Sequence, residues 1–226
     1  MSRVMQKEIQ SEMDDFFFAK EDLDFYHEYV HVEPIYLAAI KEVRTKLEIL
    51  DDEFHHRFAH NPIHHMEWRL KSPKSVVEKM KRRNLPVSVA SINGNIEDIA
   101  GIRVICNYIK DIYRISKLLL RQDDIQLLKT KDYIKKPKEN GYRSLHLVVA
   151  VPVYLAEEKK MVTVEIQIRT IAMDFWATLE HHLRYKNKNE VSDDIRQRLF
   201  DCAESITELD YEMEAIHNKL QGKHKI

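Results

Sequence analysis

Cysteine is scarce in this chain, which has only 2 among its 226 residues. Cys106 and Cys202 lie far apart and form no Cys-x-x-Cys pair, so neither a disulfide framework nor a thiolate zinc site is indicated. No apolar run reaches the roughly 18 residues that a membrane span requires, and the acidic N-terminus is unlike a signal peptide. We therefore expect a protein of the reducing cytoplasm with no membrane-spanning segment.

Glycine and proline are also few, at 4 and 6 residues. Neither a Gly-x-x-x-x-Gly-Lys loop nor a kinase-type glycine-rich loop occurs, which excludes the usual phosphate-binding cradles. With 44% hydrophobic and 32% charged residues, the composition is typical of a compact, helix-rich domain. The formal net charge of -1 hides a cluster of seven basic residues between Arg69 and Arg83, an arrangement that suits small anions better than a long nucleic acid.

Hydrophobic periodicity alternates between helical and strand spacing along the chain. Pro34 suits the first turn of one helix, and Ser72 followed by Pro73 is a good start for another. The patterns predict helices at 34–54, 73–83, 111–120, 170–185 and 192–220, and strands at 96–106, 125–134, 144–154 and 162–169. These elements indicate an α+β fold, a sheet flanked by helices, with helical extensions at both ends.

The two C-terminal helices carry apolar stripes. In the helix from Thr170 we expect the side chains of Ala172, Phe175, Trp176, Leu179 and Leu183 to face the core. The last helix has a coiled-coil-like seam from Ile195 to Leu220. This seam either packs on the matching stripe between Tyr36 and Phe54 or forms a subunit contact, and both alternatives stay open.

Five histidines lie between His55 and His65. His56 and His60 are four apart and could share a helix face as a metal pair. Because no carboxylate or cysteine accompanies them at zinc spacing, we interpret the cluster as a solvated, histidine-rich helix end.

The segment from Lys138 to His146 combines a turn with cationic and aromatic side chains. Asn140-Gly141 is a turn dipeptide that lets the backbone approach a ligand closely. Lys138 and Arg143 supply positive charge, and the Tyr142 ring is able to stack on a nucleobase. A nucleotide site is the favoured interpretation, with a solvated hairpin turn as the alternative.

Two further features fit a nucleotide. Lys71, Ser75, Lys79 and Arg82 are spaced by four, four and three residues, so they lie near one helix face and offer a row of phosphate contacts; the alternative is a solvated basic face. Asp98 at the mouth of one strand and Glu165 on the polar side of another are carboxylates of the kind that Mg²⁺ prefers, usually together with substrate phosphates. A Mg²⁺-nucleotide transfer enzyme follows as the hypothesis.

Four motifs in this order resemble the synthetase domain of the RelA/SpoT family. They are Arg69-x-Lys71-x3-Ser75-x3-Lys79, Asp98-Ile99-Ala100-Gly101-Ile102-Arg103, Lys138-x2-Gly141-Tyr142-Arg143-Ser144-x-His146 and Glu165-Ile166-Gln167-Ile168-Arg169-Thr170. The short chain is similar to the small alarmone synthetases, and its segments Asn61 to His65 and Ala172 to Trp176 look closer to the RelP branch. The resemblance divides the chain into an N-terminal helical region (1–60), the synthetase domain (61–186) and a C-terminal helix and tail (187–226).

The resemblance implies a nucleotidyltransferase-like mixed sheet and GTP pyrophosphokinase activity. Such an enzyme transfers the β,γ-diphosphate of ATP to the 3′-hydroxyl of GTP or GDP, with Mg²⁺, and yields (p)ppGpp and AMP. Small family members form homotetramers. About 60 residues precede the matching region and contain no His-Asp dipeptide, so (p)ppGpp hydrolysis is not expected.

The same resemblance assigns roles to individual residues. For ATP, Arg69 and Arg103 would sandwich the adenine, and Lys71, Ser75, Lys79 and Arg82 would hold the phosphates. Asp98 would bind Mg²⁺, and Glu165 would act as general base or metal partner. For GTP or GDP, Tyr142 would stack on guanine, Lys138, Arg143 and His146 would contact the nucleotide, Gln167 would support them, and Asp174 would contribute to guanine specificity.

Two other functions compete with this hypothesis. A generic nucleotidyltransferase would carry an Asp-x-Asp pair on a strand, but the only such pair is Asp22-Leu23-Asp24 in the acidic N-terminal region. A non-catalytic single-stranded RNA-binding module would use the basic residues and Tyr142. That module would leave Asp98 and Glu165 unexplained, because carboxylates repel RNA.

Overall fold

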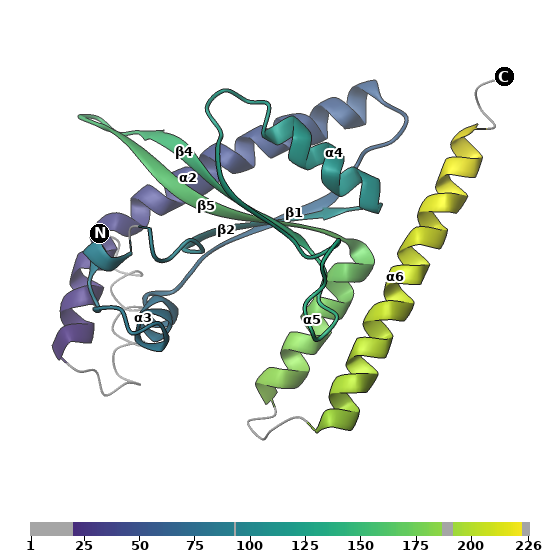
Figure 1. The fold of residues 1–226 in the computed structure, drawn as a ribbon. Coiled ribbons are helices and arrows are strands. Elements are labelled where there is room, and N and C mark those ends of the chain that lie inside the picture. Colours follow the sequence, from purple (N-terminus) through teal and green to yellow (C-terminus); the bar gives the residue numbers. More distant parts are fainter. Residues whose placement is uncertain (1–19, 93, 187–191, 223–226) are drawn as a thin grey trace. The chain divides into compact units, whose positions relative to one another are not determined.

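The computed structural model describes residues 20–92, 94–186 and 192–222, which form two compact units (Figure 1). The smaller unit comprises Met1–Pro34 and Ser72–Ile96, and the larger comprises Ile35–Lys71 and Glu97–Ile226. Residues 1–19 of the expected N-terminal helical region and residues 223–226 of the expected C-terminal tail lie outside the described residues.

The described elements alternate between helices and strands. In chain order they are α2 (Lys20–Arg57), β1 (Ile63–Leu70), α3 (Pro73–Arg82), the 3-10 helix η1 (Val89–Ser91), β2 (Ala100–Cys106), α4 (Ile109–Leu119), β3 (Gln126–Asp132), β4 (Leu145–Tyr154), β5 (Lys159–Thr170), α5 (Ile171–Lys186) and α6 (Asp193–Gly222). Four of the five strands and all five helices agree in position with the expected ones. The α+β fold class is therefore confirmed.

A five-stranded mixed sheet forms the centre of the larger unit, with strand order β1-β2-β5-β4-β3. β2 and β5 run parallel, and the other neighbours are antiparallel. In the parallel pair Gly101 lies opposite Glu165 and Arg103 opposite Gln167, while β4 places His146 opposite Gln167 on the other side. Three neighbouring strands thus bring polar side chains of distant motifs together.

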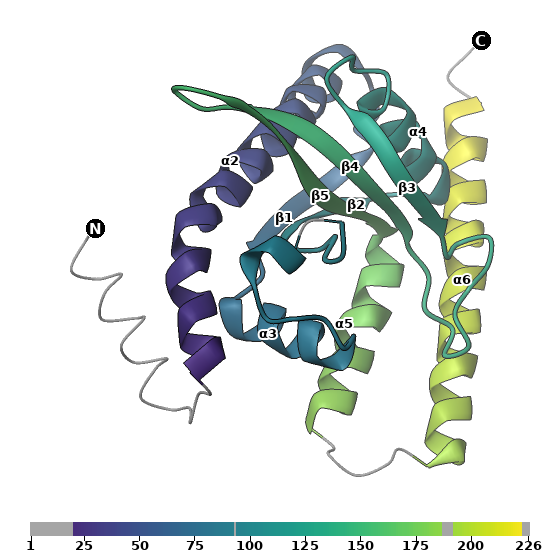
Figure 2. The same ribbon diagram turned by 60° about the vertical axis from the view of Figure 1, so that its left-hand side comes forward.

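One face of the sheet is covered by helices. Residues 35–57 of α2 and the helix α4 pack on this face, as Figures 1 and 2 show from two sides. Ile40, Val43 and Leu47 of α2 share a core with Ile112 and Ile115 of α4. The β5 side chains alternate as expected, with Val164, Ile166 and Ile168 buried in this core. The polar side chains between them face the other way.

The beginning of α2 and the strand β1 differ from expectation. Pro34 does not start a helix: α2 begins at Lys20 and continues through Pro34, because proline removes a single backbone donor and the helix on either side outweighs that loss. Strand β1 was not expected. It is an edge strand on which only Ile63 is buried. Met66, Trp68 and Leu70 do alternate with Glu67 and Arg69, but this short pattern follows two consecutive histidines and was not recognised as a strand.

The smaller unit contains α3 with the expected start. Ser72 is its N-cap, and its hydroxyl oxygen accepts a hydrogen bond from the Ser75 backbone N–H. Val76, Val77 and Met80 are buried, as expected. Lys81 forms an ion pair with Asp22 within this unit at 2.7 Å.

The predicted core face of α5 is right for Trp176 and wrong for three other residues. Phe175, Leu179 and Leu183 are exposed by 60%, 46% and 52%. Trp176 is buried as expected, together with Met173 and Ala177, and its indole N–H donates to the Leu199 carbonyl oxygen of α6 at 3.0 Å. Contact with α6 therefore decides which face of α5 is inside.

The seam of α6 is largely exposed within one chain. Ala203 and Asp210 face α5 and the sheet, whereas Leu209, Met213 and Leu220 are each about half exposed. α6 packs on α5 and α4, and the stripe of α2 is occupied by the sheet core, so the intrachain pairing of these two stripes is wrong. A subunit contact remains the expected role of the seam.

A buried carboxylate fastens α6 to the junction of β5 and α5. The Thr170 hydroxyl donates to Asp210 Oδ2 at 2.6 Å and accepts from the Met173 backbone N–H at 3.1 Å. Burial raises the pKa of Asp210 to about 6, and the nearby Glu214 charge acts in the same direction. The folded state therefore favours the protonated acid.

We expect the Asp210→Asn variant to be more stable than the wild type at pH 8 and to lose most of that advantage near pH 4. The ionised Asp210 destabilises the fold above its raised pKa, whereas it is protonated in the folded state at low pH. Thermal unfolding at both pH values measures the difference, with about 2–4 °C expected for each kcal/mol relieved. Glu208→Gln on the exposed side of α6 is the control, and equal gains at both pH values would contradict the expectation.

Candidate functional site

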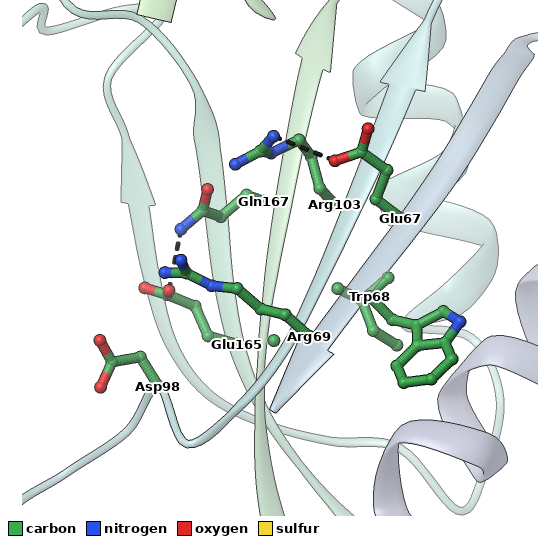
Figure 3. A pocket seen from close by; sticks show the side chains of 9 residues that line it. Glu67, Trp68, Arg69, Asp98, Arg103, Glu165 and Gln167 are labelled. Atoms are coloured by element: carbon green, nitrogen blue, oxygen red, sulfur yellow. Dashed lines mark hydrogen bonds and ion pairs between the residues drawn. The ribbon is translucent and has the colours of Figure 1, made fainter. Parts of the chain in front are cut away.

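A surface pocket of about 410 Å³ opens where β1, β2 and β5 lie side by side (Figure 3). It collects side chains of three of the four motifs together with two residues of β1. Its lining residues are Glu67, Trp68, Arg69, Asp98, Gly101, Ile102, Arg103, Glu165 and Gln167. Figure 3 shows the Trp68 indole turned away from the carboxylates, and Arg44 lies over that ring at 5.8 Å.

Two carboxylates face this pocket from adjacent strands. Asp98 precedes β2, and Glu165 lies on β5 opposite Gly101. Lys71 donates to Asp98 Oδ2 at 2.9 Å, and its backbone N–H donates to the Ile99 carbonyl at 2.8 Å, so the end of β1 holds the Asp98 segment in place. The Asp98 charge is close enough to act on the pKa of Glu165 in the upward direction. The two carboxylates therefore form one anionic pair.

Glu165 is kept ionised although it is largely buried. Burial by itself would raise its pKa, but the hydrogen bond and the charge interaction with His146, together with the hydrogen bond from Gln167, outweigh that effect and lower it. His146 Nδ1 lies 3.2 Å from Oε1, and Gln167 Nε2 donates to Oε2 at 3.0 Å. Both carboxylate oxygens are thus held by protein groups.

A network extends from Glu165 to the Lys138–His146 segment. Tyr142 Oη and His146 Nε2 are 2.8 Å apart. Burial, together with the Arg169 and Lys138 charges, lowers the pKa of His146 despite its contact with Glu165. Lys138 lies over the Tyr142 ring at 4.5 Å, and burial likewise lowers the pKa of Lys138. Lys138, Tyr142 and His146 are therefore joined to the pocket through Glu165.

Arg169 is the centre of this network, and its side chain is only 6% exposed. Its guanidinium donates to Tyr142 Oη at 2.6 Å, to Gln167 Oε1 at 2.8 Å and to Asp174 Oδ1 at 3.1 Å. Asp174 Oδ1 also lies 3.6 Å from Arg103 Nε, and Arg103 donates to Glu67 at 3.1 Å. An unbroken series of polar contacts thus joins Glu67 at one end to Tyr142 at the other.

The turn before Tyr142 is held from two helices. Gly141 has φ +86°, a conformation that favours glycine. Asn140 donates to Glu180 of α5 at 3.1 Å, and Arg143 donates to Glu204 of α6 at 2.9 Å. Arg143 therefore points toward α6 in this structure, away from the pocket network.

Apart from Arg143, which pairs with Glu204, the expected site residues fall into three groups. Arg69, Lys71, Asp98, Arg103, Glu165 and Gln167 meet at the pocket or, for Lys71, through Asp98. Lys138, Tyr142, His146 and Asp174 join them through the network described above. Ser75, Lys79 and Arg82 lie on α3 of the smaller unit.

Sequence reasoning missed Arg169 and Glu67 as site residues. Arg169 shares the polar side of β5 with Glu165 and Gln167, and this period-2 alternation was a usable signal. Glu67 shares the polar side of β1 with Arg69 in the same way, but it was missed because β1 itself was not recognised. Both residues are placed by strand pairing.

The histidine cluster does not form a metal pair on one helix face. His56 lies at the end of α2, where its Nδ1 contacts the Asp52 carbonyl oxygen, whereas His60 lies beyond the helix and pairs with Asp111 at 2.8 Å. In the described part of the chain, no group of three or more histidine, cysteine or acidic side chains is arranged to hold a metal ion.

No helix among the described residues is long and apolar enough to cross a bilayer.

Comparisons with known proteins point to one family. A model described as the region found in RelA / SpoT proteins matches residues 68–190. The chain is 42% identical over 186 residues to the GTP pyrophosphokinase YwaC of Bacillus subtilis, covering 82% of this chain and 89% of that protein. It is 37% identical over 186 residues to the GTP pyrophosphokinase YjbM of the same species, covering 82% and 87%.

Solved structures agree with the sequence relatives. Small alarmone synthetase 2 from Bacillus subtilis matches with a TM-score of 0.77 at 41% identity, covering 85% of this chain and 99% of that one. Small alarmone synthetase 1 from the same species, bound to its product pppGpp, matches with a TM-score of 0.78 at 36% identity, covering 87% and 98%. Each likeness covers more than four fifths of this chain.

We expect Gly141→Ala to destabilise the fold more than Gly94→Ala. Both glycines have positive φ, but a Cβ at Gly141 would lie 2.6 Å from the Ala203 Cβ, whereas nothing lies within 4 Å at Gly94. Placing alanine at a positive φ costs roughly 1 kcal/mol of stability in both variants. The further loss of stability in Gly141→Ala therefore measures the contact with α6. Chemical denaturation gives the free energies of unfolding.

A double-variant cycle isolates this contact, because Ala203→Gly removes the Cβ that would clash but itself costs roughly 1 kcal/mol within α6. In the Ala203→Gly background we expect Gly141→Ala to cost about as much as Gly94→Ala does. The same large excess in that background would show that the close approach of the turn to α6 is not what excludes a side chain at this position.

Proposed function

The chain belongs to the RelA/SpoT family and is a GTP pyrophosphokinase; we propose that the pocket containing Asp98 and Glu165 is where it makes (p)ppGpp. The observation that carries this assignment is the convergence of the two carboxylates with Arg69 and Arg103 in one pocket. In the reaction the β,γ-diphosphate of ATP moves to the 3′-hydroxyl of GTP or GDP, and AMP leaves.

The donor half of the site is basic. Arg69 and Arg103 line the pocket and are proposed to hold the adenine between their guanidinium planes, which stack well on aromatic rings. Lys71, Ser75, Lys79 and Arg82 are proposed to bind the ATP phosphates. Their cationic and hydroxyl groups suit phosphate oxygens and neutralise charge on the transferred group.

The carboxylate pair fits a divalent cation. Asp98 and Glu165 supply hard oxygen ligands in one pocket, and Mg²⁺ usually takes one or two carboxylates with substrate phosphates and water. We propose that Asp98 is the main ligand and that Glu165 is either its partner or the base. When bound, Mg²⁺ would offset charge on the diphosphate during transfer.

Glu165 is the proposed general base for the acceptor hydroxyl. Its pKa is lowered, because the hydrogen bond and charge interaction with His146 and the hydrogen bond from Gln167 outweigh the effect of burial, so it is ionised at neutral pH. A base must lie within hydrogen-bond reach of the hydroxyl that attacks the β-phosphorus of ATP. The position of Glu165 between the Asp98 end of the pocket and the Tyr142 network supports this proposal.

The acceptor half of the site surrounds Tyr142. We propose that the Tyr142 ring stacks on guanine, that Lys138 and His146 contact the nucleotide, and that Gln167 supports them. Asp174 is proposed to accept from guanine N–H groups, as a carboxylate can. Arg143 would contact the acceptor only by exchanging its ion pair with Glu204 for the nucleotide.

We also propose how the protein assembles and where it is located. The exposed apolar side chains of α6, including Leu209, Met213 and Leu220, suit a subunit contact, and we propose a homotetramer in the cytoplasm. The comparisons lend no support to an RNA-binding module, since the relatives named above are GTP pyrophosphokinases.

The direct test incubates the purified protein with Mg²⁺, γ-labelled ATP and GTP or GDP, and separates the nucleotides. We expect label to enter guanosine penta- or tetraphosphate with an equal amount of AMP. Asp98→Asn should abolish transfer, and Glu165→Gln should lower it about 10²- to 10⁴-fold, the usual effect of losing a general base. Glu158→Gln on the exposed β4–β5 turn is the control and should leave the rate unchanged.

If the wild type transfers no label to either acceptor, the synthetase assignment is wrong. If it does transfer label and both carboxylate variants retain full activity, the pocket is not the site of the reaction.

A further inference from the structure

We propose that Arg169 is a positioning residue that orients both groups holding the Glu165 carboxylate, one through Tyr142 and His146 and the other through Gln167. This inference rests on the proposed function, because its consequence for the rate requires that Glu165 be the base. The orientation itself is a property of the free protein.

The first branch follows from what each group is able to donate. An arginine has only donors, so the Tyr142 oxygen accepts the bond from Arg169 at 2.6 Å. If the Tyr142 oxygen also accepted from His146, its single hydrogen would have no acceptor among the contacts of this hydroxyl in the described residues, so we assign that hydrogen to His146 Nε2 at 2.8 Å. His146 Nε2 is therefore an acceptor without hydrogen.

The protonation of the imidazole follows from this step. With Nε2 as acceptor, the neutral His146 ring carries its hydrogen on Nδ1. Nδ1 lies 3.2 Å from Glu165 Oε1, so this N–H donates to the carboxylate. The hydrogen bonds run in one direction, from Arg169 through Tyr142 and His146 to Glu165.

The second branch obeys the same rule. Arg169 donates to Gln167 at 2.8 Å, and the partner atom must be the amide oxygen because arginine has no acceptor. The amide NH₂ group therefore faces Glu165 and donates to Oε2 at 3.0 Å. Reversing the amide would set donor against donor at Arg169 and acceptor against acceptor at Glu165.

Arg169 itself is locked in place. It is almost completely buried, it pairs with Asp174 at 3.1 Å, and its Nε donates to the Ser144 hydroxyl at 3.4 Å. The guanidinium also lies 5.1 Å from the centre of the Tyr142 ring. A rigid, planar cation with donors in fixed directions is suited to set the orientation of two neighbours at once.

The Tyr142 hydroxyl thus has a role separate from the ring that is proposed to stack on guanine. Tyr142→Phe keeps the ring and cuts only the first branch, so it separates the two. We expect kcat to fall about 3- to 10-fold, as for the loss of one hydrogen bond, with the KM values for GDP and ATP changed less than twofold.

The decisive readout is the tautomer of His146 in the free protein, measured by ¹⁵N NMR of the imidazole nitrogens. We expect the wild-type ring to be neutral and protonated at Nδ1, and the Tyr142→Phe ring to lose this preference. Tyr113→Phe is a matched control, because it also removes a partly buried hydroxyl, one that donates to Asp132 at 3.2 Å outside this network. It should change neither kcat nor the His146 spectrum.

Several results would overturn the proposal. A wild-type ring that is protonated at Nε2 alone or at both nitrogens contradicts the direction of the first branch, whatever the variant does. An unchanged tautomer and an unchanged kcat in a folded Tyr142→Phe protein contradict the positioning role. The NMR measurement needs no turnover, so an inactive wild type would refute the proposed function while leaving the hydrogen-bond assignment to be judged by the spectrum.

Discussion

The parallel pairing of β2 with β5 is the constraint on which the site depends. Parallel neighbours cannot be joined by a tight turn, and here about fifty residues containing α4, β3 and β4 separate the two strands. The register opposite Gly101 brings Glu165 beside the segment that ends in Asp98. A shift of one residue would turn Glu165 and Gln167 into the core and move Ile166 to the pocket face. The same register therefore sets both the core and the chemistry.

Burial of a charge governs the acceptor side of the site. Arg169 is an ion taken out of water, which is tolerated only when its charge and donors are matched by partners. Asp174 supplies the charge, and Tyr142, Gln167 and Ser144 supply oxygen acceptors. These partners belong to two of the motifs and to α5, so the burial of one guanidinium connects segments that are otherwise independent. A buried donor or charge left without its partner would lower the stability of the fold. This favours a single arrangement of the side chains around Arg169.

The C-terminal helix has two different faces with two different roles. Ala203, Glu204 and Asp210 of α6 meet the Gly141 turn, Arg143 and Thr170, so this face supports the residues that surround the site. Leu209 and Met213 of the same helix are each about half exposed beside this face.

The sequence by itself was sufficient to predict most of the helices and strands of this protein. Turns and helix caps depend on immediate neighbours along the chain, as at Ser72, Asn140 and Gly141. The same is true of the alternation around Glu165. Most helices and strands could therefore be predicted from the sequence, and so could most of the side chains that the structure brings together. Charge likewise led to the predictions that Lys71 binds phosphate and that Asp98 binds Mg²⁺.

The remaining features were decided by contacts between distant segments. β1 is a strand because it pairs with β2, and α5 buries Trp176 instead of Phe175 because α6 lies on that side. The turn of Arg143 toward Glu204 and the central place of Arg169 also require partners far along the chain. Periodicity along one segment tells which residues share a face, but only the tertiary structure decides what that face meets.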